Sequence, residues 1–110
     1  MISIVSEKKE AQKYIKSIDG FFDLYKSATK FNAQKNLYSS KFKTIVDNLN
    51  SNSDYKKDTL KGKILRENML GDKTLTLIAA ENAYSVAHVY NLKQKILREF
   101  AAIVFEVIII

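Results

Sequence analysis

The chain contains no cysteine and no proline, and only three of its 110 residues are glycine. The absence of cysteine excludes disulfides, thiolate zinc sites and a cysteine nucleophile. Because proline and glycine are the main helix breakers, their scarcity permits long helices along most of the chain. Proteins without cysteine fit a reducing compartment, so we expect a cytoplasmic location.

The sequence also lacks a long apolar run and has only one histidine, His88. The longest apolar run, 101–110, is interrupted by Glu106 and is half of the ~20 residues that cross a bilayer, so we expect no membrane span. One histidine without cysteine makes a transition-metal site improbable. Glycine-rich phosphate loops and zinc-protease motifs are absent from the sequence. A catalytic histidine needs an orienting carboxylate and a nucleophile, and the spacing of Glu81 and Ser85 from His88 is only a weak match to that pattern. We therefore predict a non-enzyme with no catalytic residues, metal or cofactor.

Positive charge is in excess. Eighteen lysines and arginines face twelve acidic residues, which gives a net charge of +6, while 46% of the residues are hydrophobic. That composition is typical of a globular protein, and the length predicts one domain, 1–110. Most of the cations are lysines, which suit phosphate contact more than base reading. The charge therefore favours DNA or RNA as a partner, with simple solubility as the plain alternative.

The apolar periodicity predicts helices. A helix that starts at Ser6 places Ala11, Ile15, Ile18, Phe22 and Tyr25 on one face, unless Gly20 ends it. Further helices are expected over about 33–49, from 53 or 54 to about 70, and from about 76 to 102. The fold class is thus mainly α, a compact bundle of four to five helices. The alternative is α+β, with a small sheet formed by residues 2–5, 74–89 and the 103–110 tail.

Two lysine-rich segments are the candidate nucleic-acid interface. The first lies between Asp23 and Asp47, where no acidic residue occurs and aromatic residues alternate with lysines. The second cluster runs from Lys56 to Arg66, where Asp58 and Glu67 reduce the net charge. Cations bind phosphates, and exposed aromatic rings stack on bases. The ordinary alternative is a solvated helix face over a core. A third cluster, Lys93, Lys95 and Arg98, is assigned to solubility. The candidate nucleic-acid-binding residues are Lys26, Lys30, Lys35, Lys41, Lys43, Lys56, Lys57, Lys61, Lys63 and Arg66.

The segment 103–110 is unusual because seven of its eight residues are apolar and most are β-branched. Termini are normally polar, and several isoleucines left in water form an aggregation-prone patch. The segment has three alternatives: it extends the last helix into the core, pairs as a strand with residues 2–5, or is buried against another chain. The candidate partner-binding residues are Val107, Ile108, Ile109 and Ile110, with a protein partner or a homo-oligomer as the expected assembly.

One local resemblance concerns residues 70–75, which read LGDKTL and are followed by Ile78 and Glu81. This stretch is similar to one in the helical core-binding domain of phage-type tyrosine recombinases, a domain that clamps DNA and carries no catalytic residues. The chain departs from that family in spacing: the segment 38–70 is too long and the segment 81–85 too short. We therefore assign the chain to no family.

Three functions are consistent with these patterns. The leading prediction is non-catalytic, largely sequence-nonspecific nucleic-acid binding through lysine-rich helix surfaces, which weakens with salt. The alternative is a protein-interaction module, such as an inhibitor, immunity or assembly factor, that uses the apolar C-terminal segment. The third is a small basic ribonuclease-type toxin.

Overall fold

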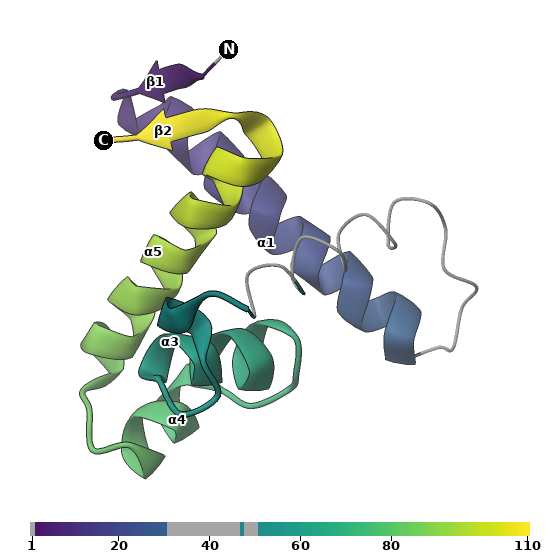
Figure 1. Ribbon diagram of the computed structural model, residues 1–110, viewed down its shortest axis with the longest axis vertical. Coiled ribbons are helices and arrows are strands. Elements are labelled where there is room, and N and C mark those ends of the chain that lie inside the picture. The colour runs from purple at the N-terminus through teal and green to yellow at the C-terminus, as the bar shows by residue number, and fades with distance from the viewer. Residues whose placement is uncertain (1, 31–46, 48–50) are drawn as a thin grey trace.

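The computed structural model describes residues 2–30, 47 and 51–110 (Figure 1). The helix expected over 33–49, and with it Lys35, Lys41 and Lys43, lies outside the described residues apart from Asp47. The elements in chain order are β1 (Ser3–Val5), α1 (Lys8–Lys30), the 3₁₀ turn η1 (Ser53–Tyr55), α3 (Leu60–Lys63), the π-helical turn η2 (Ile64–Met69), α4 (Leu75–Glu81), α5 (Val86–Phe105) and β2 (Val107–Ile109). The mainly helical fold class is confirmed, together with a small sheet.

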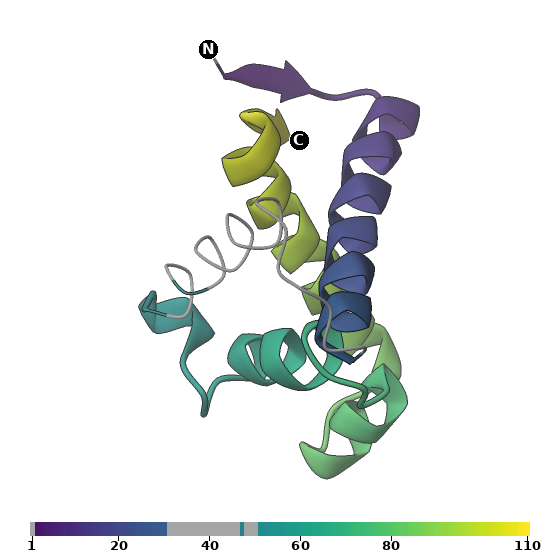
Figure 2. The same cartoon turned by 90° about the vertical axis from the view of Figure 1, so that its right-hand side faces the viewer.

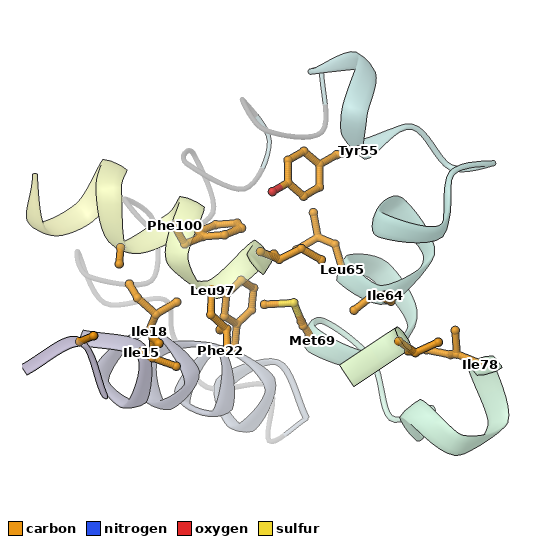
Figure 3. Close-up of a cluster of buried hydrophobic side chains, with 14 of the residues drawn as sticks. Ile15, Ile18, Phe22, Tyr55, Ile64, Leu65, Met69, Ile78, Leu97 and Phe100 are labelled. Atoms are coloured by element: carbon orange, nitrogen blue, oxygen red, sulfur yellow. The ribbon is translucent and has the colours of Figure 1, made fainter. Parts of the chain in front are cut away.

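Helices α1 and α5 form the centre of the molecule and run in opposite directions (Figure 2). The predicted apolar face of α1 is buried, including Ile15, Ile18 and Phe22, and the helix continues through Gly20. Phe22 meets Phe100 of α5 edge to face, with ring centroids 5.0 Å apart. Leu97, one turn earlier on α5, is buried in the same cluster (Figure 3). The two helices therefore share one apolar seam.

The segment 53–81 covers the first half of α5 (Figure 1). Its buried side chains, Tyr55, Ile64, Leu65, Met69 and Ile78, extend the same core (Figure 3). The helix expected to start at residue 53 or 54 begins instead at Leu60, because the hydroxyl of Thr59 accepts a hydrogen bond from the Gly62 amide at 3.0 Å. Such a cap fixes the start of a helix.

Two helices, α4 and the start of α5, occupy most of residues 74–89, so the hairpin alternative for this segment is wrong, as is an unbroken helix over 76–102. The chain turns between α4 and α5, where Ala83 has a φ of 59°. Two hydroxyl caps explain the division: Thr74 accepts from the Leu77 amide and Ser85 accepts from the His88 amide, at 3.2 and 3.1 Å. Each cap starts its own helix, and the left-handed Ala83 joins them.

The Ile-rich segment 103–110 combines two of its three expected outcomes. It extends α5 to Phe105, and then Glu106 turns the chain with a φ of 55°. The remainder pairs with β1 as a parallel strand, with Ile4 opposite Ile108. Val5 and Val107 are buried against the helices, and α5 contacts β2. The sheet part of the α+β alternative is thus present for residues 2–5 and the tail, without 74–89.

Candidate functional site: a groove between α3 and α5

A shallow groove of about 450 Å³ lies beside the first half of α5. One wall comes from η1 and the start of α3, and the other from the α4–α5 turn and α5. We call it the α3–α5 groove; its lining residues are Asp54, Thr59, Leu60, Lys61, Tyr84, His88, Leu92 and Lys95. These residues combine cations, an exposed ring pair and an apolar floor, so the groove is the candidate site.

The α5 wall follows from helical spacing. His88, Leu92 and Lys95 are separated by four and three residues, so they line one side of the helix. Arg98 lies one turn beyond Lys95, and both side chains are exposed. A cationic stripe therefore runs along α5 from the groove.

An aromatic pair stands at one end of the groove. The rings of Tyr84 and His88 are stacked with centroids 4.9 Å apart and an angle of 24° between their planes. Tyr84 is 50% exposed, and His88 is also exposed. Tyr84 owes its position to the left-handed Ala83 and to its own amide, which donates to the carbonyl of Ala79 at 3.0 Å. The turn between the helices thus presents an aromatic surface to solvent.

Next to the groove, Glu99 joins two segments of the fold. Lys61 Nζ donates to Glu99 Oε1 at 2.8 Å, and the hydroxyl of buried Tyr55 donates to Glu99 Oε2. The Lys61 ammonium also lies 5.4 Å from the centre of the Tyr55 ring. These contacts hold η1 and α3 against α5.

Burial shifts the pKa of both charged partners. The pKa of Lys61 is lowered, first by burial and then by the nearby charge of Lys95, while Asp54 acts in the opposite direction. The pKa of Glu99 is raised, first by burial and then by the charge of Asp54. Both shifts disfavour the charged forms, as expected for groups partly withdrawn from water. Asp54 and Lys95 are therefore close enough to the pair to act on it electrostatically.

Gly62 explains how closely the wall segments approach. A Cβ atom at this position would overlap the backbone oxygen of Lys56 and come within 2.7 Å of the Arg66 guanidinium. Only glycine permits this approach, which holds the loop 56–59 against α3. Lys56 and Lys57 are exposed on that loop, and in sequence they lie between the lining residues Asp54 and Thr59.

The predicted lysines have different surroundings. Lys63 Nζ donates to Asn82 Oδ1 at 2.7 Å, and Arg66 donates to the Gly62 carbonyl at 3.2 Å. Lys26 lies 3.8 Å from Asp23 and donates to the Asn68 carbonyl at 3.5 Å. The side chain of Lys30 is not among those described. Of the second cluster, Lys61 lines the groove and Lys56 and Lys57 are exposed on the adjoining loop, whereas Lys63 and Arg66 make the contacts given above.

Sequence reasoning missed the most distinctive groove residues. The sequence does not single out Tyr84, it predicts a structural or surface position for His88, which is exposed, and it assigns Lys95 and Arg98 to solubility. The four-residue spacing of Tyr84 and His88 was the available signal, but the hairpin alternative for 74–89 obscured it. Lys93 of the same cluster lies 3.8 Å from Asp19, away from the stripe.

Comparison with protein-family models, curated proteins and solved structures found no match to this chain. Within the described residues, no three side chains of the metal-binding types come together, and no helix is long and apolar enough to cross a membrane. The candidate site therefore rests on its own geometry.

We expect Tyr55→Phe to lower the free energy of unfolding at pH 7 by about 1–2 kcal/mol, because a part-buried carboxylate loses a donor. It also raises the pKa of Glu99 further, since the lost hydrogen bond favoured the charged form. The loss shrinks as the pH falls through the folded-state pKa of Glu99, which burial holds above the ordinary glutamate value, because the protonated carboxyl no longer needs the donor to stabilise a charge.

Urea denaturation at several pH values measures this loss, and NMR titration measures the pKa of Glu99. Tyr90→Phe is the control, because Tyr90 is 52% exposed and should change stability by less than about 0.5 kcal/mol. Equal losses for the two variants would contradict the assigned role of Tyr55.

Proposed function

We propose that this protein is a non-catalytic nucleic-acid-binding protein whose binding surface is the α3–α5 groove and the cationic stripe beside it. The observation that carries the proposal is that Lys61 and Lys95 line one groove together with an exposed aromatic pair. The exposed cations Lys56, Lys57 and Arg98 lie on the segments that form its walls. Lysines and arginines bind the phosphate backbone, and exposed rings add contacts to bases.

The charge around the groove supports this assignment. Glu99 is paired with Lys61, so its charge is largely compensated. Asp54 and Asp58 lie on the loop opposite α5 and oppose the binding of anions. The exposed cations Lys56, Lys57, Lys95 and Arg98 outnumber them, and a phosphate chain that follows the stripe stays close to the cations.

The test is fluorescence anisotropy with labelled 15-nucleotide DNA, single-stranded and duplex, from 25 to 200 mM salt. We expect Lys95→Gln/Arg98→Gln to weaken binding about tenfold and to reduce the salt slope by about two, one for each lost phosphate contact.

The matched control is Lys9→Gln/Lys13→Gln, which removes the same charge from exposed residues of α1 that lie near Phe105 at the far end of α5. A change within about twofold is expected, since only long-range attraction is lost. Equal effects of the two double variants would remove the groove from the proposal, and no binding by the unmodified protein at 25 mM salt would remove nucleic-acid binding altogether.

A second candidate function is self-association through the outer face of the β1–β2 sheet. The alternating register places Ile2, Ile4, Ile108 and Ile110 on one face, with exposed fractions of 63, 68, 47 and 82%. Among the described residues the sheet has only these two strands, although parallel sheets are normally covered on both faces. Of the four predicted partner-binding residues, Ile108 and Ile110 are exposed, Ile109 is partly buried and Val107 is buried.

A second copy of this chain is the occupant that fits this face. The four isoleucines offer on the order of 400 Å² of apolar surface, enough for the apolar centre of an interface of about 800 Å² per partner. A twofold axis would bring the same four isoleucines of both copies together, so that apolar side chains contact apolar side chains.

We expect Ile4→Lys/Ile108→Lys to shift the protein from dimer to monomer in sedimentation-velocity runs, because the introduced lysines would be buried without partners at the dimer interface. Leu24→Lys, at another exposed apolar position, is the control and leaves the dimer intact. A monomeric unmodified protein at 100 μM would exclude self-association as a function.

A further inference from the structure

We propose that the α3–α5 groove binds one unpaired base of a single-stranded nucleic acid, which stacks on Tyr84 while the flanking phosphates contact Lys95 and the exposed lysines of the loop 56–59. This inference rests on the proposed function, and it specifies that the bound nucleic acid is single-stranded. Three features of the groove carry it.

The first feature is the ring pair. Tyr84 and His88 stack nearly parallel, so His88 supports one face of the tyrosine and holds it in place. Half of the Tyr84 surface stays open to solvent at the edge of the groove. A ring fixed from behind and open in front is a platform on which any base can stack, because every base has a π-face.

The second feature is the floor. Leu60 and Leu92 are partly buried and line the groove together with the ring pair, so a flat, weakly polar group meets apolar surface there. The volume of about 450 Å³ lies within the range of small-molecule sites, which suits one base with its sugar. A duplex offers no such group, since its bases are paired and stacked on each other.

The third feature is the distribution of charge. Asp54 lines the groove, and Glu99 lies beside it on Lys61. A phosphate inside the groove would face these carboxylates, whereas a neutral base would not. Lys95 lines the groove, and the exposed cations Lys56, Lys57 and Arg98 lie on the segments that form its walls. The arrangement therefore places the base inside and the phosphates outside.

Three 15-nucleotide probes test the inference by anisotropy at 50 mM salt: an intact single strand, a strand of the same length in which every nucleotide is abasic, and the duplex. The intact strand should bind at least about fivefold more tightly than the abasic strand, since a stacked base contributes that much or more. Tyr84→Leu should lose about 5- to 50-fold on the intact strand and nothing on the abasic strand. Tyr84→Phe, which keeps the ring, should bind within about twofold of the unmodified protein.

Tyr90→Leu is the matched control, because Tyr90 has a similar exposure on α5 but does not line the groove. Circular dichroism checks that each variant is folded. Equal affinity for intact and abasic strands, or an equal loss by Tyr84→Leu on both, would overturn base stacking while leaving phosphate binding in place. If none of the three probes binds, the proposed function fails together with the inference.

Discussion

The apolar seam between α1 and α5 is the contact on which the rest of the structure depends. Phe22 and Phe100 meet at its centre, and each is almost fully buried. Deletion of a buried aromatic side chain typically costs 3–5 kcal/mol, a large fraction of the stability of a domain of this size. Both ends of the molecule are built on this seam. The sheet joins the start of α1 to the end of α5 (Figure 1), and residues in the first half of α5 line the groove.

The two surfaces of interest therefore lie at opposite ends of one helix. The α3–α5 groove involves residues 88–95 of α5, whereas β2 follows directly after its last residue, Phe105. The helix rises about 1.5 Å per residue, so the two surfaces are separated by about 20 Å. Nucleic-acid binding at one end and self-association at the other are thus compatible, and a dimer would present two grooves to one strand.

The local elements were largely predictable from sequence. The spacing of Ala11, Ile15, Ile18 and Phe22 predicted the buried face of α1. The α4–α5 division was harder, because it depends on the Thr74 and Ser85 caps and on a left-handed Ala83 where glycine is usual.

The groove could not be predicted, because its parts are distant in sequence. Lys61 and Glu99 are 38 residues apart, and Tyr55 and Glu99 are 44 apart. No local pattern indicates that these side chains meet. The lysine count likewise did not separate Lys63, which is bound to Asn82, from Lys56, which is exposed. Packing decides which cations are available to a ligand.

The central claim is that ligand contact is concentrated at the α3–α5 groove. The most direct measurement is an NMR titration of ¹⁵N-labelled protein with the single-stranded 15-mer at low salt. The account predicts that the largest amide shifts fall in residues 54–61 and 84–98. Shifts concentrated in the first half of α1 or in the β1–β2 sheet, with the groove unchanged, would contradict it.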